Sequence, residues 1–287
     1  QLSPLRVASK GVFLPPPPPP VWPWRFPSEP GSNGFEGIVQ GQDPSSYQVE
    51  ELHLAAMHFA SFALVAPTFF TCDEWTSLPA GVQKTCAWAS IARFARRAYR
   101  RPLRVAESGR LKAFLQANVS AGPLDEAVAL TVAGILQAPP MHFRVESGKK
   151  SVPLNQWELA TRLSYFLWDS MPDAALFRAA ESGQLLDSDD IERQARRMLD
   201  DPKARSAVVR FHHQWLGTDE VLLVAPARRA FGPLFGITPR LKNASDDDLE
   251  WPAIMGPVRH SLKLETELFV EETIFDNEGT FSALFFV

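Results

Sequence analysis

Two adjacent histidines offer the clearest chemistry in this sequence of 287 residues. His212 and His213 stand in the string FHHQWLG, which ends at Gly217. An imidazole can act as a general base or as a metal ligand near neutral pH. Neighbouring residues of a helix point about 100° apart, so at most one histidine can face a given site. The alternative is structural, with one histidine in solvent and the other hydrogen-bonded in a core packed by Phe211 and Trp215.

Carboxylates of the last predicted helix are the natural partners for such a histidine. Glu265 and Glu267 lie in the string LETELFVEE, and Glu267 shares a helical face with Glu271, four residues later. The candidate catalytic residues are therefore His212 or His213 with Glu265 or Glu267. The alternative is a solvated charged face. Carboxylate metal sites in helix bundles use a Glu-x-x-His motif, which both helices lack, so we expect no metal site.

Common catalytic and cofactor signatures are absent. The sequence contains no G-x-S-x-G, P-loop, dinucleotide fingerprint or H-E-x-x-H motif. It has no CxxC pair and no CxxCH, which excludes a zinc knuckle and a covalently attached haem in this chain. We therefore expect no cofactor in the chain itself.

The elements that would hold these residues are best marked between Leu154 and Gly217. This stretch predicts a series of short helices, each with its own start and stop signals. The start signals are Asn155 with Glu158, then Pro172, then Asp187 with Asp190, then Asp201 with Pro202; the stop signals are Gly183 and Gly217. The first of these helices should bury an apolar face made of Trp157, Leu159, Leu163, Phe166 and Leu167.

Helix signals also fill most of the remaining chain. The apolar periodicity predicts helices over 47–65, 84–100, 107–119, 124–137 and 258–275, with a short extended segment over 141–146. In the last helix we expect Leu262, Phe269 and Ile274 to face inward, with Leu264 or Leu268 beside them. Strand signals are scarce, so the predicted fold class is all-α, an irregular multi-helix array with a proline-rich N-terminal arm.

That arm covers residues 1–48. Pro15–Pro20 forms a run of prolines, which favours a stiff polyproline II rod, and Trp22 and Trp24 follow it. These aromatic side chains need burial, so the arm either straps across the globular body or binds an aromatic groove of another protein. Residues 49–150 are expected to form one helical domain and residues 151–287 a second.

The C-terminal string SALFFV is the other expected contact with a partner, through Phe285 and Phe286. An apolar tail is poorly placed in water, so we expect the second domain to be truncated and both ends to belong to a longer protein. The net charge of −4 gives no reason to expect nucleic acid or an anionic membrane. No apolar run reaches the roughly 18 residues of a membrane span.

The chain has two cysteines, Cys72 and Cys86. In an exported protein, cysteines this close in sequence would close a local disulfide. The alternative is a pair of free buried thiols.

Several long strings resemble a known family. They are FARRAYRRPL at 94–103, ELATRLSYFLWDSMPDAAL at 158–176, and further on GQLLD, RRMLDDPKAR and FHHQWLG. Together they resemble the large secreted proteins of planctomycetes and myxobacteria that carry consecutive PSD-type domains of unknown function. Members of this family often bear, or are encoded beside, c-type cytochrome modules. The resemblance runs from about Phe35 to Phe275 and implies a mostly helical, exported protein.

Family members also place a Cys-loop-Cys segment before the RRPL element, which favours the Cys72–Cys86 disulfide. The resemblance implies a periplasmic or extracellular bacterial location, protein subunits as partners, and haem c on a partner or on a further domain. It supplies no reaction. The leading hypothesis is an accessory or scaffold subunit of an exported, redox-linked assembly. The competing hypotheses are a secreted oxidoreductase or hydrolase acting on an extracellular polymer, and a carbohydrate-binding module.

Overall fold

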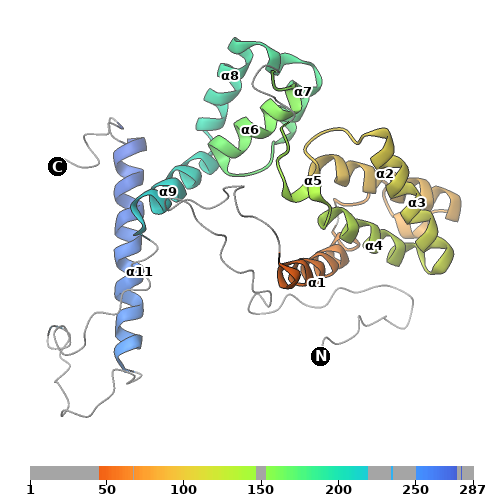
Figure 1. Ribbon diagram of the computed structural model, residues 1–287, viewed down its shortest axis with the longest axis horizontal. Coiled ribbons are helices and arrows are strands. Elements are labelled where there is room, and N and C mark those ends of the chain that lie inside the picture. Colours follow the sequence, from red (N-terminus) through yellow and green to blue (C-terminus); the bar gives the residue numbers. More distant parts are fainter. Residues whose placement is uncertain are drawn as a thin grey trace. The chain divides into compact units, whose positions relative to one another are not determined.

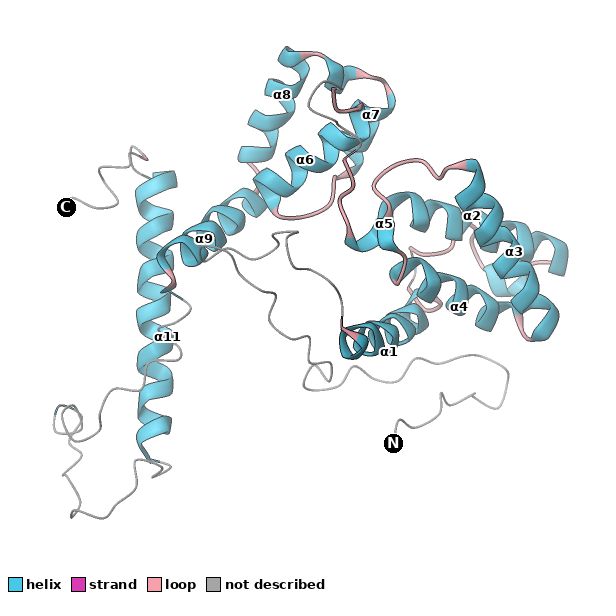
Figure 2. Ribbon diagram, viewed as in Figure 1, coloured by secondary structure: helices cyan, strands magenta, loops and turns pink. Residues whose placement is uncertain are grey.

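The computed structural model describes residues 45–66, 68–146, 153–218, 234, 250–276 and 279. Every regular element in these residues is helical, which confirms the all-α prediction (Figure 1, Figure 2). The elements are α1 (Ser46–Ala63), η1 (Trp75–Ser77), α2 (Ala80–Ala98), α3 (Val105–Ala121), α4 (Leu124–Leu136), α5 (Pro139–His142), α6 (Gln156–Trp168), α7 (Ala174–Glu181), η2 (Gln184–Leu186), α8 (Ser188–Leu199), α9 (Pro202–Leu216), α11 (Glu250–Glu271) and η5 (Glu272–Asp276).

The four residues expected to bind a partner, Trp22, Trp24, Phe285 and Phe286, lie outside the described residues. The proline run at Pro15–Pro20 also lies outside them. In the part of the chain that is described, no helix has the length and apolar character needed to cross a membrane.

The chain divides into two compact units. The first contains the described residues up to Tyr165 together with Ser170–Ile191, and the second contains Phe166–Asp169 with the described residues from Glu192 onward. The division falls within α6 and α8.

Helix α4 is the centre of the first unit, where it packs against α1, α2 and α3 (Figure 1). Seven of its 13 residues are buried, which is the pattern of a helix surrounded by others. The facing positions of α1 and α2 are largely alanine, including Ala56, Ala60, Ala87 and Ala95. Such small side chains allow neighbouring helix backbones to approach closely, so the first unit is built around α4.

Side-chain caps fix the helix starts that the sequence predicted. The Asn155 carboxamide oxygen accepts from the backbone N–H of Trp157 and of Glu158, and the Glu158 carboxylate accepts from the Asn155 N–H. Asp187 accepts from two backbone N–H groups at the start of α8, and Asp201 accepts from Lys203 at the start of α9. Each such cap is worth about 1 kcal/mol.

The predicted disulfide is confirmed. Cys72 and Cys86 are bonded, with their Cα atoms 6.1 Å apart. Helix α2 begins at Ala80, earlier than the predicted Lys84. Cys86 lies within α2 and is 2% exposed. The bond therefore ties the segment before η1 to the first turns of α2.

The extended segment predicted over 141–146 is wrong in its first half. Met141 and His142 belong to the short helix α5, which begins with Pro139. A proline in the first helical turn costs no hydrogen bond, because the N–H of that position has no acceptor inside the helix. The pair Pro139-Pro140 therefore starts a helix here rather than only ending the one before it.

Helix α11 also begins earlier than predicted, at Glu250 instead of Val258. The prediction treated Pro252 and Pro257 as loop residues. Pro252 falls in the first turn, where its missing N–H is harmless, and Pro257 lies inside the helix and removes one backbone hydrogen bond. Pro257 itself is exposed.

Two predicted apolar faces are wrong in part. On α6, Phe166 is 81% exposed instead of inward-facing. On α11, four residues named for the inward face are exposed by 39–55%, namely Leu262, Leu264, Leu268 and Phe269, whereas Ile274 in η5 is partly buried. The residues buried on this helix and on η5 are Met255, Val270 and Thr273. Periodicity reveals that a helix has distinct faces, but packing decides which face is covered, and here three leucines of α11 remain exposed.

Candidate functional site

Helix α9 places the two histidines at its C-terminal end. Asp201 caps its start, and Pro202 occupies the first helical position. Gly217 ends the helix with a φ of 63°, and its N–H donates to the carbonyl of His213. This left-handed conformation suits glycine because it has no Cβ. The chain therefore turns at Gly217, one helical turn after His213, and brings Thr218 beside the imidazole ring.

His213 joins α9 to α11 within the second unit. Its side chain is 7% exposed, and Nε2 lies 3.1 Å from Oε1 of Glu267. Nδ1 makes a short hydrogen bond with the hydroxyl oxygen of Thr218. In the neutral ring with its proton on Nε2, that N–H donates to the Glu267 carboxylate and the Thr218 hydroxyl donates to Nδ1. One tautomer therefore satisfies all three groups.

The other predicted site residues are placed apart from this group. His212 is 7% exposed, and its Nδ1 contacts the carbonyl of Val208 at 2.8 Å, one turn earlier in α9. Its ring also packs edge-on against Phe211 and Trp215. Glu265 is exposed. Of the four candidates, the structure brings together His213 and Glu267.

Both histidines are buried, whereas the structural alternative expected one of them in solvent. The two rings point about 100° apart, and each finds a different hydrogen-bond partner. His212 bonds within its own helix, so it adds nothing to the His213 group.

The arrangement can do one of two things chemically. A hydroxyl, an imidazole and a carboxylate in series can make the hydroxyl oxygen more nucleophilic, because the ring accepts its proton and the carboxylate stabilises the charged ring. The same three groups can also act as a fixed link between two helices. Metal binding by His213 is disfavoured, because both ring nitrogens are already engaged. Within the described ranges, no group of three or more His, Cys, Asp or Glu side chains gathers as a metal site would.

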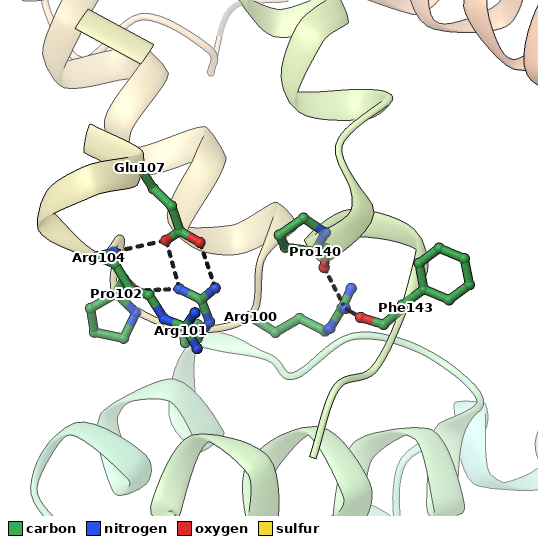
Figure 3. A network of polar contacts seen from close by, with 7 residues as sticks. All are labelled: Arg100, Arg101, Pro102, Arg104, Glu107, Pro140 and Phe143. Carbon is green, nitrogen blue, oxygen red and sulfur yellow. Dashed lines mark hydrogen bonds and ion pairs between the residues drawn. The ribbon is translucent and has the colours of Figure 1, made fainter. Parts of the chain in front are cut away.

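A second polar cluster, in the first unit, was missed by the sequence reasoning. Arg100 follows α2 with a φ of 57°, and its guanidinium is almost fully buried. Its two terminal nitrogens donate to four backbone carbonyls at distances of 2.7–3.1 Å; the acceptors are Ala98, Pro140, Met141 and Phe143. Figure 3 shows the bonds to Pro140 and Phe143. Burial lowers the pKa of Arg100, and Tyr165 partly opposes this shift.

Arg101 completes the cluster by pairing with Glu107 at the start of α3. Two guanidinium nitrogens each lie 2.8 Å from a different oxygen of the carboxylate, which also accepts from the backbone N–H of Arg104 at 2.8 Å (Figure 3). These bonds from Arg101 and Arg104 lower the pKa of Glu107 from 4.5 to about 2, against the effect of burial. The arrangement fixes the turn between α2 and α3.

The sequence held a signal for this cluster. The string YRRPL puts two arginines between the end of α2 and Pro102, where the C-terminal carbonyls of a helix need donors. Three of the four carbonyl acceptors of Arg100 lie 40 to 43 positions away, so no local pattern reveals them.

Comparison with protein families identifies two domains. Residues 154–286 match the model described as PSD4, a protein of unknown function (DUF1592), and residues 86–146 match PSD5, a protein of unknown function (DUF1595). The PSD-type domains that the resemblance predicted are therefore present. His213 and Glu267 lie in the first match, and Arg100 and Glu107 lie in the second. No curated protein and no solved structure matches the chain.

Proposed function

We propose that this protein is an accessory or scaffold subunit of an exported, redox-linked assembly. One observation carries the proposal, namely the exposed apolar surface on α11. Leu264 and Leu268 are 52% and 55% exposed, on the longest helix of the described residues. An apolar surface that the described residues leave uncovered is typical of a protein-binding face.

The two sides of α11 have different roles. Met255 and Val270 are buried, and Glu267 binds His213 of α9. At about 100° per residue, Leu264 and Leu268 lie on roughly the opposite side of the helix from Met255 and Val270. The two leucines therefore lie outside the face of α11 that contacts α9. It is a separate surface, directed away from the part of the helix that stabilises the fold.

Two further observations support export and a redox setting. The Cys72–Cys86 disulfide is compatible with an oxidising compartment outside the cytoplasm. The PSD4 and PSD5 matches support the resemblance to secreted proteins that work beside c-type cytochrome modules. Haem c would then belong to a partner or to a further domain, since this sequence contains no CxxCH.

The test is native purification followed by cross-linking and mass determination, with an absorption spectrum of each fraction. We expect the chain to co-purify in a complex with a component that shows the spectrum of c-type haem. A chain that purifies alone, at the mass of its own monomer, would contradict the proposal.

A second function, hydrolysis by a secreted enzyme, is favoured by the Thr218–His213–Glu267 group. In this function the Thr218 oxygen attacks an ester carbonyl or glycosidic carbon while its proton moves to Nδ1 of His213. The bond from that carbon to the alcohol oxygen breaks, and the alcohol leaves with the proton from His213. Water, deprotonated by His213, then cleaves the Thr218-bound intermediate and returns the proton to the Thr218 oxygen. The assay uses the purified chain with nitrophenyl esters and glycosides. Activity that Thr218→Ala removes and Thr218→Ser retains would support hydrolysis. Turnover that is absent, or equal in both variants, would exclude it.

A further inference from the structure

One stripe of α11 has the spacing of a helix-docking seam. It consists of Pro257, Ser261, Leu264 and Leu268, all of them exposed, and we name it the outer stripe. Successive members are four, three and four residues apart. This is the spacing at which side chains of one helix meet those of a second helix packed along it. The outer stripe therefore fits a helical partner better than an extended strand.

Leu268 has a carboxylate on each side along the helix. Glu265 lies three residues before it, and Glu271 and Glu272 lie three and four residues after it. Residues three and four apart are neighbours on a helix surface, so these three glutamates border the apolar patch directly. None of them makes an ion pair with any other residue that the structure describes.

The positive charges of the helix, Arg259 and Lys263, both precede Leu264. From Leu264 to Asp276 the chain contains five acidic residues and neither lysine nor arginine. Two of the five are already paired, Glu267 with His213 and Asp276 with Arg205. The remaining three surround Leu268, so the charge left unbalanced on this part of α11 is concentrated at the exposed leucines.

We propose that the outer stripe binds a basic amphipathic helix of a partner protein. The leucines would pack against apolar side chains of that helix, and its flanking lysines or arginines would pair with Glu265, Glu271 and Glu272. This inference rests on the proposed accessory role and names the chemistry of the partner. Complementary charge would set the rate and the salt dependence of binding, and the leucines would supply the buried contact.

The same charges argue against two other occupants. A second copy of α11 would bring its own glutamates against these, and like charges at an interface oppose association. An anionic membrane surface would repel them for the same reason. Of the three occupants, the basic helix alone turns the acidic border into a favourable contact.

The test is a binding measurement on the full chain with designed helical peptides as probes. The first peptide has three heptads with leucine at the a and d positions and lysine at the e and g positions. The second replaces the lysines by glutamate, and the third keeps the lysines and replaces the leucines by alanine. Fluorescence anisotropy at low and at physiological salt gives the dissociation constants. We expect the first peptide to bind at least about tenfold more tightly than the other two.

Two variants of the protein locate the binding. Leu264→Gln with Leu268→Gln should weaken binding of the first peptide about tenfold. Its control, Leu186→Gln at another exposed leucine, should leave binding unchanged.

The triple change Glu265→Gln, Glu271→Gln and Glu272→Gln should weaken binding and remove most of its salt dependence. Its matched control removes three exposed carboxylates elsewhere, by Glu50→Gln, Asp73→Asn and Asp189→Asn, and should bind like the wild type. Circular dichroism verifies that each variant is folded.

Specific outcomes overturn the inference. Equal binding of the lysine and glutamate peptides, or equal loss in the triple variant and its control, would do so. If the wild type sediments as a dimer and the double leucine variant as a monomer, the occupant of the outer stripe is a second copy of the chain and not a basic helix. If native purification gives a complex while peptide binding ignores these changes, the accessory role stands and this inference fails. If the peptides bind as expected but the native chain purifies alone, the proposed accessory role is contradicted instead.

Discussion

His213 and Glu267 stand 54 positions apart in the chain, and the structure places Nε2 of the first 3.1 Å from Oε1 of the second. The imidazole is almost completely buried, while the carboxylate is 34% exposed. Water can therefore solvate the carboxylate from one side, while the ring depends on its two partners, Glu267 and Thr218. The contact joins the last turn of α9 to the C-terminal part of α11 and links the two helices whether or not it performs chemistry.

The first prediction concerns the strength of this link. His213→Ala should lower the free energy of unfolding by about 1–3 kcal/mol, because it removes two hydrogen bonds of a buried group. A double-mutant cycle with Glu267→Ala, measured by urea denaturation, should give a coupling of at least about 0.5 kcal/mol. The exposed His260 on α11 supplies the control, since His260→Ala should change stability by less than about 0.5 kcal/mol. Strictly additive losses would mean that the two side chains do not interact in solution.

The second prediction concerns acid stability. The pKa of Glu107 is lowered from 4.5 to about 2 in the folded protein by its bonds to Arg101 and to the Arg104 N–H. A lowered pKa means that the contribution of Glu107 to stability is complete above its unfolded pKa. It is lost as the pH falls from about 4.5 to about 2, and its size is roughly 2–3 kcal/mol.

Glu107→Gln should therefore destabilise the protein at pH 7 and flatten the dependence of unfolding free energy on pH between 5 and 2. Chemical denaturation at several pH values measures both effects. Glu50→Gln, at an exposed position of α1, is the matched control and should leave the pH profile as it is in the wild type. A profile for Glu107→Gln that keeps the wild-type slope would show that this carboxyl does not titrate with a lowered pKa.

The helices could be predicted from sequence because their signals are local. Asn155, Asp187 and Asp201 each bond to backbone N–H groups two or three residues away, so a short string contains the whole interaction. The disulfide was also within reach, since its two cysteines lie only 14 positions apart. Pro139 and Pro252 lie in first helical turns that the sequence signals did not predict, because a proline can begin a helix as well as end one.

The faces of the helices could not be predicted in the same way. Leu262, Leu264, Leu268 and Phe269 spread over more than one side of α11, so composition alone does not identify the covered side. Three of the four carbonyls that Arg100 contacts lie 40 to 43 positions away, and Glu267 lies 54 positions from His213, so only the fold brings these groups together. For the candidate site, the sequence identified the residue types and left two choices at each position, and the structure selected His213 and Glu267.

The third prediction concerns Arg100. Its guanidinium donates to four carbonyls that extend from the end of α2 to Phe143, and a lysine ammonium has three donors on a single nitrogen. Arg100→Lys should therefore leave buried carbonyls unpaired and lower the free energy of unfolding by about 2–4 kcal/mol. Amide hydrogen exchange in residues 139–146 should accelerate along with it. Arg110→Lys, at an exposed position of α3, should change neither quantity. An unchanged exchange rate in this segment would contradict the role assigned to Arg100.

The last prediction concerns the disulfide. A bond that closes a loop of this length stabilises a protein by about 3 kcal/mol, mainly because it restricts the unfolded chain. The bond also holds the start of α2 in the folded state, because Pro79, which precedes this helix, gives it no side-chain cap. Two other contacts bind the same segment to α2, from Thr71 N–H to Ser90 and from Arg93 to the Phe69 carbonyl. Reduction should therefore destabilise the first unit without unfolding it at 25 °C.

Urea denaturation with and without a phosphine reductant measures this effect. The free energy of unfolding of the wild type should fall by about 3 kcal/mol on reduction. The double variant Cys72→Ala with Cys86→Ala should have this lower free energy of unfolding with and without the reductant. Alanine suits position 86 because Cys86 is buried in an apolar core, where a serine hydroxyl would add a cost of its own. Hydrogen exchange should quicken first in the opening turns of α2, which the bond ties down. If the reduced wild type kept its full stability, the folded contacts of Ser90 and Arg93 would hold this segment without the bond.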